Sequence, residues 1–474
     1  MTGGTSQELY QARIPIYPRS VHGRFRTLKW GILALAYGVY FLLPWVRWER
    51  AIGVPQAVSF DIEARRFYLF DLVVHAQDIF WLAGLLVIAA LLLFFVTGIA
   101  GRVFCGYFCF QTLWTDVFLL VERLVQGERP ARIRLDKQPW NAEKLAKKSL
   151  THFLWLCVGF WTGFTFTLYW GNAPDLFRAF FTGAAPFPAY ATTLFLTLTT
   201  YVMAGLAREQ VCTYMCPYSR FQGAMFDRST LIVAYDDKRG EGESGRHKIA
   251  RGFKSREDRE VEGAGDCIDC GYCVQVCPTG IDIRNGLQYQ CISCALCIDA
   301  CDTIMDSLGW PRGLIKYTSE KAQQGEKTRL LTAKNVGYGV ALLAAIVALA
   351  ASIIGAVPLD FTVAQVRQPL FVQLSDGRVQ NSYEIKLNNK TDRAVPFVLE
   401  IAGLPGAELD MGQMDPGHLT LQPEQSMRLL ARVRVMPHGD DARSREFRFV
   451  VRPQADSDIP VLEQPANFHL AGPR

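Results

Sequence analysis

The 474-residue sequence predicts a multidomain membrane protein in three parts: an α-helical transmembrane bundle of about five spans, an inserted cysteine-rich domain, and a C-terminal β-sandwich of immunoglobulin type. Three observations lead to this prediction. Apolar residues make up 50% of the chain and are concentrated in a few long segments. Eight of the 13 cysteines fall in two runs of equal spacing. The last segment, of about 110 residues, alternates between polar and apolar side chains.

Five segments are long and apolar enough to cross a bilayer whose hydrocarbon core is about 30 Å thick. The predicted spans are residues 28–46, 78–100, 149–170, 189–206 and 335–357. The first lies too far inside the chain, and is too aromatic, for a cleaved signal peptide. The formal net charge of +5 is modest and does not suggest a nucleic-acid partner.

The distribution of lysine and arginine predicts how the chain is oriented in the membrane. These residues are abundant before the first span and in segments 101–148 and 207–334. Such segments stay on the cytoplasmic side. We therefore expect a cytoplasmic N-terminal segment (1–27), four helices in 28–225, a cytoplasmic insert (226–334), a fifth helix (335–357) and a periplasmic domain (358–474).

The two cysteine runs have the spacing C-x2-C-x2-C-x3-C. They comprise Cys267, Cys270, Cys273 and Cys277, followed by Pro278, and Cys291, Cys294, Cys297 and Cys301, followed by Asp302. This spacing is typical of bacterial ferredoxins with two [4Fe–4S] clusters, in which the fourth cysteine of each run ligates the other cluster. Zinc sites use two separated C-x2-C pairs, and disulfides need an oxidising compartment, so both alternatives fit less well.

The crossing pattern assigns two ligand sets. The first predicted cluster is held by Cys267, Cys270, Cys273 and Cys301, and the second by Cys277, Cys291, Cys294 and Cys297. Asp302 stands where proline is usual after the second run, which puts a local turn in doubt but no ligand.

Two segments flank this ferredoxin-like region. Residues 226–262 are charged and contain glycine, which predicts a mobile linker with a short strand at 231–235. Residues 358–474 contain about seven short alternating runs, typical of an antiparallel sandwich. This C-terminal domain has no cysteine, so no disulfide joins its sheets.

Two further cysteine pairs follow predicted spans. Cys105 and Cys109 form a C-x3-C pair after the second span, and Cys212 and Cys216 form another after the fourth, each with tyrosine at the third position. On a helix the two sulfurs of such a pair lie on one face. Soft thiolates suit Cu(I), iron–sulfur clusters or zinc, so we predict a copper or redox site where the four thiols converge. The alternative is that they are buried small apolar residues, which is our interpretation of the isolated Cys157.

These features together resemble the CcoG/FixG/RdxA family of bacterial cytochrome c oxidase accessory proteins. The resemblance rests on FCGYFCFQTLWTD, CTYMCPYSRFQ, CIDCGYCVQVCPTGIDIRNGLQYQCISCALCIDAC and QPLFVQLSDGRVQNSYEIKLNNK. It implies an inner-membrane oxidoreductase that reduces Cu(II) to Cu(I) for assembly of the cbb3-type oxidase. The implied partners are a copper-transporting P-type ATPase, copper chaperones and subunits of that oxidase.

Two other functions stay open at this point. The ferredoxin insert and a C-x3-C-P sequence after a span also resemble quinol dehydrogenases of the nitrate-reductase accessory type. Such a subunit would transfer electrons without copper chemistry, although members of that family usually lack an immunoglobulin-like tail. The third alternative is a non-enzymatic scaffold whose tail docks the oxidase. Copper content after purification distinguishes the electron-transfer subunit from a copper reductase. Loss of oxidase assembly while copper reduction stays intact would favour the scaffold.

Overall fold

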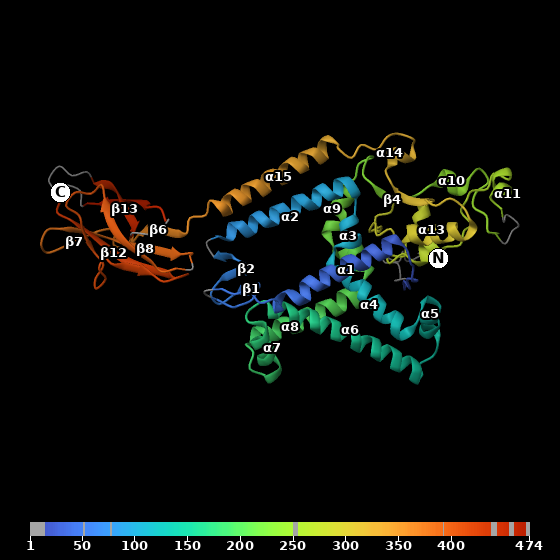
Figure 1. Ribbon diagram of the computed structural model, residues 1–474, viewed down its shortest axis with the longest axis horizontal. Coiled ribbons are helices and arrows are strands. Elements are labelled where there is room, and N and C mark those ends of the chain that lie inside the picture. The colour runs from blue at the N-terminus through green and yellow to red at the C-terminus, as the bar shows by residue number, and fades with distance from the viewer. Residues whose placement is uncertain are drawn as a thin grey trace, which may run out of the picture. The chain divides into compact units, whose positions relative to one another are not determined.

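The computed structural model describes residues 15–50, 53–75, 78–249, 255–391, 393–437, 443–454 and 459–470. The chain divides into two compact units (Figure 1). One comprises residues 1–46, 57–60 and 80–349, and the other comprises 47–56, 61–79 and 350–474. The cysteine-rich insert belongs to the first unit, together with the apolar helices.

Among the described residues, five helical segments are long and apolar enough to cross a membrane, which agrees with the predicted number of spans. They are Arg24–Trp45, Ile79–Ala100, Val103–Gln126, Phe187–Ala207 and Ala333–Ile354. Two of them, α2 (Ile79–Ala100) and α15 (Ala333–Ile354), lie side by side (Figure 1), with the rings of Phe94 and Tyr338 6.0 Å apart. Their side chains are largely exposed, as expected for helices that face lipid.

The set of apolar helices differs from the prediction at one place. The predicted span 149–170 lies in α6 (Ala142–Leu168), which is not among the five, whereas Val103–Gln126 was assigned to a cytoplasmic loop. Four threonines lower the hydropathy of α6: Thr151, Thr162, Thr165 and Thr167. Val103–Gln126 carries Asp116 and Glu122, but both are buried against basic side chains. Half of this segment is buried inside the protein.

The remaining helices of this region pack around these segments. The segment Arg24–Trp45 consists of α1 (Arg24–Leu42) and the 3-10 turn η1 (Leu43–Trp45). Val103–Gln126 consists of α3 (Val103–Tyr107) and α4 (Phe110–Gln126), and α5 (Arg129–Lys137) follows. Glycine lets α6 approach α8 (Phe187–Thr200) closely, since a Cβ on Gly163 would lie 2.6 Å from the carbonyl oxygen of Thr193. The other helices are α7 (Ala173–Thr182), the π-helical η3 (Tyr201–Ala207) and η4 (Val211–Met215), and α9 (Pro217–Met225).

The cysteine-rich insert is built on a two-stranded sheet and one longer helix. Strand β4 (Ile232–Tyr235) pairs antiparallel with β5 (Ile315–Thr318), so the short strand predicted at 231–235 is confirmed. Between them lie α10 (Asp237–Glu241), α11 (Arg256–Val261), α12 (Tyr272–Gln275), η6 (Ile283–Asn285) and α13 (Leu296–Leu308). Helix α14 (Glu320–Gln323) precedes α15.

The mobile linker predicted at 226–262 is wrong for most of its length, although residues 250–254 lie outside the described part. Several of its charged side chains pair with the insert, whereas others, such as Lys238, Glu243 and Glu257, are exposed. The Arg239 guanidinium donates to Asp266 at 2.6 Å. Arg259 is fully buried and donates to the carbonyl oxygen of Cys267 at 3.0 Å. A charge-rich sequence therefore packs against the start of the first cysteine run.

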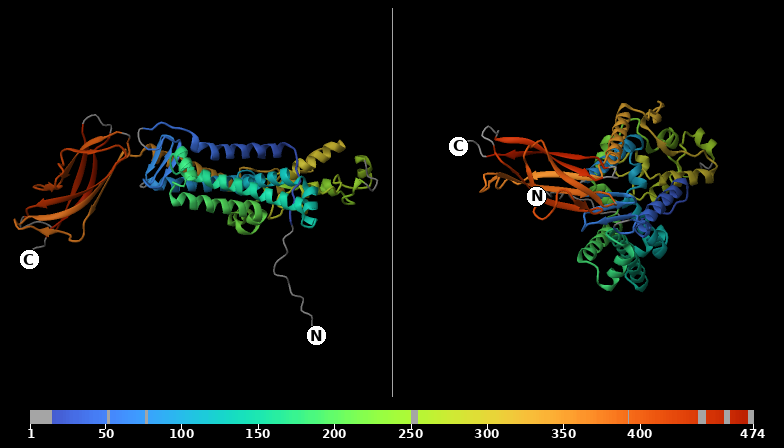
Figure 2. Two further views of the ribbon diagram at one scale, coloured as in Figure 1. Left: turned by 90° about the horizontal axis from the view of Figure 1, so that it is seen from below. Right: turned by 60° about the vertical axis from the view of Figure 1, so that its left-hand side comes forward.

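The C-terminal domain is an antiparallel β-sandwich, as predicted (Figure 2). One sheet has the order β10-β12-β8-β6 with β7 added to β8, and the other has the order β11-β9-β13-β14. The strands are β6 (Leu359–Gln365), β7 (Val372–Gln373), β8 (Val379–Asn389), β9 (Val395–Ala402), β10 (Glu408–Asp410), β11 (Leu419–Leu421), β12 (Ser426–Val435), β13 (Ser444–Pro453) and β14 (Leu462–His469). Tyr383, Phe397 and Phe449 lie in the core between the sheets and are fully buried.

A β-hairpin belongs to the same unit as the sandwich. It consists of β2 (Arg66–Leu69) and β3 (Leu72–His75). Strand β1 (Val58–Asp61) lies in the first unit except for its last residue. Arg66 donates to the Glu424 carboxylate at 2.6 Å, and Lys390 donates to Asp78 at 2.7 Å. These partly buried ion pairs attach the hairpin to the sandwich.

Candidate electron-transfer site

Two cavities in the insert are lined by cysteines. One is lined by Cys267, Cys270, Cys273 and Cys301. The other is lined by Cys277, Cys291, Cys294 and Cys297, and also by Cys273. Apart from Cys273, which lines both cavities, the cysteines separate into the two sets that the crossing pattern predicts. Four soft thiols around one enclosed space are the donor set of a [4Fe–4S] cluster, so these residues fit that group.

Helix α13 explains why the fourth cysteine of the second run crosses to the other set. Cys297 and Cys301 lie about one turn apart on this helix, and each lines a different cavity. The helix continues through Asp302, whose carboxylate accepts a hydrogen bond from the Gly313 backbone at 3.1 Å. The turn that proline would impose after the second run is therefore absent here, and the ligand positions are unaffected.

The two cysteine loops share an unusual backbone. Left-handed φ angles occur at Asp269 and Gly271 around Cys270, and at Ser293 and Ala295 around Cys294. Such conformations are costly for residues other than glycine and are concentrated at functional sites. Burial raises the pKa of Cys273 and of Cys294 to about 12. Bound iron would offset this effect, because metal binding favours the thiolate.

The two C-x3-C pairs have the same local structure. Cys105 lies in α3 and Cys109 is the N-cap of α4, while Cys212 lies in η4 and Cys216 is the N-cap of α9. In both pairs the backbone N–H of the second cysteine donates a hydrogen bond to the carbonyl oxygen five residues earlier. Cys109 donates to Phe104 at 3.0 Å, and Cys216 donates to Val211 at 2.8 Å. The expectation of one continuous helix face is wrong, because the chain turns into a new helix at each second cysteine.

The two pairs lie in one neighbourhood. The Cys105 thiol donates to Gln222 Oε1 at 3.0 Å, and Gln222 lies on α9, which Cys216 caps. Burial, followed by the nearby thiols Cys109 and Cys105, raises the pKa of Cys212 to about 12. Within the described residues, however, no three His, Cys, Asp or Glu side chains gather closely enough to hold a metal ion. Convergence of all four thiols on one metal stays a prediction.

The first pair packs against the second cysteine run. A Cβ on Gly106 would lie 2.7 Å from the carbonyl oxygen of Ile292 and 2.9 Å from the Cα of Cys294. The Tyr107 hydroxyl donates to the Cys294 carbonyl at 3.1 Å. Cys105 and Cys294 also belong to one buried apolar cluster. Only glycine at position 106 permits this approach between the thiol pair and a predicted cluster ligand.

The second pair contacts the same run through hydroxyl groups. Ser219 Oγ donates to the Cys216 carbonyl at 2.9 Å and lies 2.6 Å from the Tyr289 hydroxyl, two residues before Cys291. Ser219 and Gln222 are buried polar residues that sequence reasoning did not single out. No sequence spacing marks Ser219 or Gln222, because their roles depend on contacts between segments that are distant in the sequence.

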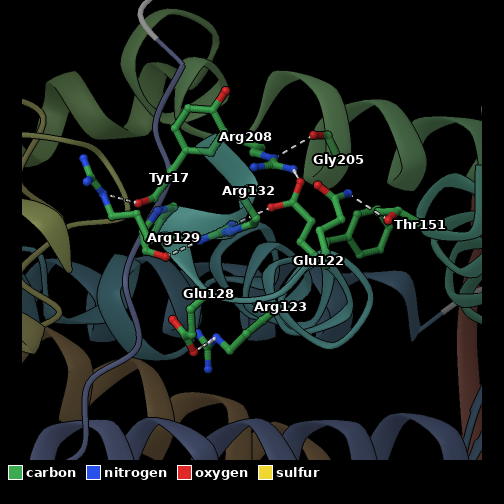
Figure 3. A network of polar contacts seen from close by, with 12 residues as sticks. Tyr17, Glu122, Arg123, Glu128, Arg129, Arg132, Thr151, Gly205 and Arg208 are labelled. Atoms are coloured by element: carbon green, nitrogen blue, oxygen red, sulfur yellow. Dashed lines mark hydrogen bonds and ion pairs between the residues drawn. The ribbon is translucent and has the colours of Figure 1, made fainter. Parts of the chain in front are cut away.

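A buried charge network holds the turn before the second pair (Figure 3). The Glu122 carboxylate pairs with Arg132 at 2.9 Å and also with Arg208. Arg208 has a φ of 44° and donates to the Gly205 carbonyl at 2.7 Å. It lies four residues before Cys212, so the network fixes the backbone that leads into η4.

A second set of contacts joins the insert to α1. Asp299 on α13 accepts hydrogen bonds from the backbone of Phe25 at 3.2 Å and of Arg26 at 2.7 Å, which satisfies free N–H groups at the start of α1. Lys29 on α1 is 1% exposed and pairs with Asp116 on α4 at 2.8 Å. These contacts hold the cysteine-rich insert against the helices that carry the thiol pairs.

Comparisons with known proteins agree with this architecture. Residues 207–320 match the family model of a 4Fe-4S dicluster domain, and residues 349–470 match that of the IG-like fold at the C-terminal of FixG. Protein RdxA of Cereibacter sphaeroides is 44% identical over 411 residues, which cover 85% of each chain. Nitrogen fixation protein FixG of Rhizobium meliloti is 38% identical over 98% of this chain and 94% of its own.

The chain belongs to the FixG/RdxA family. The family resemblance found in the sequence is thus confirmed. This FixG/RdxA chain is a membrane iron–sulfur protein of oxidoreductase type, with five apolar helices, a dicluster domain and an immunoglobulin-like domain. The crystal structure of a FixG-related protein from Vibrio parahaemolyticus matches 24% of this chain and 97% of its own, at 21% identity and a TM-score of 0.21.

Proposed function

We propose that this protein is a cupric reductase, which reduces Cu(II) to Cu(I) at the thiols of Cys105, Cys109, Cys212 and Cys216. The predicted ligand sets are Cys267, Cys270, Cys273 and Cys301 for one cluster, and Cys277, Cys291, Cys294 and Cys297 for the other. The contact of Gly106 and Tyr107 with Cys294 is the observation that supports this proposal most strongly. Cys294 is a predicted cluster ligand, so this contact supports electron transfer from that cluster to the thiol pair.

The chemistry of the residues suits this reaction. Bound [4Fe–4S] clusters supply single electrons, and one electron converts Cu(II) to Cu(I). Cysteine thiolates prefer the softer Cu(I), so the four thiols stabilise the product. Since burial keeps Cys212 protonated at neutral pH, binding of copper there would release a proton to solvent. Thiolate binding and metal reduction therefore favour each other.

The partners and location follow as part of the same proposal. The insert and the thiol pairs face the cytoplasm of a bacterial inner membrane, and the immunoglobulin-like domain faces the periplasm. Cu(I) passes to a copper-transporting P-type ATPase and copper chaperones, and then to subunits of a cbb3-type oxidase. The abundance of lysine and arginine in the insert supports its cytoplasmic location.

Copper reduction by the full-length protein tests the proposal. The protein is reduced with dithionite, freed of dithionite, and mixed with Cu(II) and a chromogenic Cu(I) chelator. We expect reduction by the native chain and by Cys157→Ser, a matched control in which an exposed cysteine outside both pairs is replaced. We expect loss of reduction when all four thiols are replaced by serine with iron content unchanged. Undiminished reduction in that variant would contradict the proposed copper site.

An electron-transfer subunit without copper chemistry is the second candidate. It is favoured by the match of residues 207–320 to the model of a 4Fe-4S dicluster domain, which accounts for electron transfer and does not require copper. Copper measured per chain, after purification in copper-containing medium, separates the two functions. Copper that binds to the native chain and is lost from the four-serine variant supports cupric reduction, and its absence from both supports the second candidate.

A further inference from the structure

Arg102 is a buried cation between the two thiol pairs and the second cysteine run. It follows α2 directly and is 4% exposed. Its Nε donates to Gln222 Oε1 at 3.4 Å, its Nη1 donates to the Tyr289 carbonyl, and its guanidinium lies over the Tyr289 ring at 5.6 Å from the centroid. Among the described residues, Arg102 forms an ion pair with no carboxylate.

A buried charge without an opposite charge is strongly destabilising. Thiols that can become negative lie close to the partners of Arg102. Gln222 Oε1, which accepts a hydrogen bond from Arg102, also accepts one from the Cys105 thiol at 3.0 Å. The Tyr289 carbonyl lies two residues before Cys291. Metal-bound thiolates at these cysteines would provide the negative charge that the protein side chains do not.

Most cations beside the other cysteine set pair with carboxylates. Arg284 pairs with Asp269 and with Asp282, both at 2.7 Å. Arg239 and Arg256 both pair with Asp266, at 2.6 and 3.4 Å. The fully buried Arg259 donates to the Cys267 carbonyl at 3.0 Å. Arg102 differs from Arg239, Arg256 and Arg284 because no carboxylate among the described residues pairs with it. In the first set Cys270 is exposed and Cys267 is buried, and in the second set Cys294 is buried.

We propose that Arg102 raises the reduction potential of the cluster held by Cys277, Cys291, Cys294 and Cys297. A reduced cluster carries one more negative charge, and a nearby cation in a buried environment stabilises that state. Arg102 thereby lowers the free energy of an electron on the side of the thiol pairs. It favours electron transfer from the side of the exposed Cys270 toward Cys105. This inference rests on the ligand sets of the proposed function.

The test is a potentiometric titration of the full-length protein in detergent, without copper, followed by EPR. In Arg102→Gln we expect the midpoint of one cluster to fall and that of the other cluster to stay unchanged. Arg102→Lys, which keeps the charge, restores most of the lost potential. The matched control is Arg312→Gln, which removes a surface arginine paired with Asp306 and leaves both midpoints unchanged.

A second variant tests the same effect in case Arg102→Gln does not fold. Gln222→Glu keeps the shape of the side chain but adds a carboxylate beside the guanidinium, so the same midpoint should fall. Unchanged midpoints in a variant that retains eight irons per chain would overturn the role of Arg102. That result leaves copper reduction by the native chain intact, whereas failure of the copper proposal leaves the shift in midpoint intact.

Discussion

The contact between Gly106 and the second cysteine run gives the most direct test of the structure. In Gly106→Ala, the new Cβ would lie 2.7 Å from the Ile292 carbonyl oxygen and 2.9 Å from the Cys294 Cα. Both are backbone atoms, which cannot turn aside as a flexible side chain can. The first thiol pair and the loop of the second run must therefore move apart.

The size of the effect follows from two opposing contributions. Overpacking of a close contact costs up to about 3 kcal/mol, and replacing glycine by alanine in a helix returns about 1 kcal/mol. The net loss of stability is about 2 kcal/mol. Gly106 belongs to a unit of about 320 residues, for which 1 kcal/mol corresponds to about 1.5 °C, so the apparent unfolding midpoint falls by about 3 °C.

The assay is thermal unfolding of the full-length protein in detergent at one scan rate, followed by the visible absorbance of the clusters. The matched control is Gly223→Ala in α9, where a Cβ meets no atom within 4 Å. This variant should unfold at the same temperature as the native chain or slightly higher. If Gly106→Ala is as stable as Gly223→Ala and retains its iron, the proposed close packing of the thiol pair on Cys294 is incorrect.

Four further predictions follow from other contacts. Asp299→Ala removes the acceptor of two backbone N–H groups at the start of α1 and should cost about 1–2 kcal/mol of stability, measured by thermal unfolding, with a smaller loss for Asp299→Asn. Lys29→Met leaves Asp116 without its closest partner and should cost about 3–5 kcal/mol, whereas the double variant Lys29→Met/Asp116→Leu should recover much of that loss; a double variant as unstable as the single one would refute the pairing argument. Burial lowers the pKa of His75, so the unfolded chain binds more protons below about pH 6.5 and stability of the sandwich unit should fall as pH decreases through that range; His75→Gln should weaken this dependence in unfolding followed by circular dichroism. Phe397→Ala should destabilise the sandwich by about 3–5 kcal/mol, while the iron content per chain stays unchanged; a parallel loss of iron would contradict the division into two units.

Local patterns in the sequence predicted most of the architecture. The spacing of the eight cysteines, the length of the apolar segments and the alternation after residue 358 depend on neighbours along the chain, and each pattern predicts its element independently of the rest. The error at Val103–Gln126 has the opposite origin. The lysines and arginines of segment 101–148 predicted a cytoplasmic loop, and only the arrangement in space shows that Asp116 and Glu122 are paired with Lys29, Arg132 and Arg208.

The sequence by itself determined that this chain has a dicluster domain, two thiol pairs, apolar helices and a sandwich. Tertiary structure alone decided how the thiol pairs lie relative to the predicted cluster ligands. The approach of Gly106 to Cys294 and the contacts of Gln222 with Cys105 and Arg102 join residues that are more than 100 positions apart. No periodicity or spacing encodes such contacts, because they depend on how separate helices and loops pack against one another.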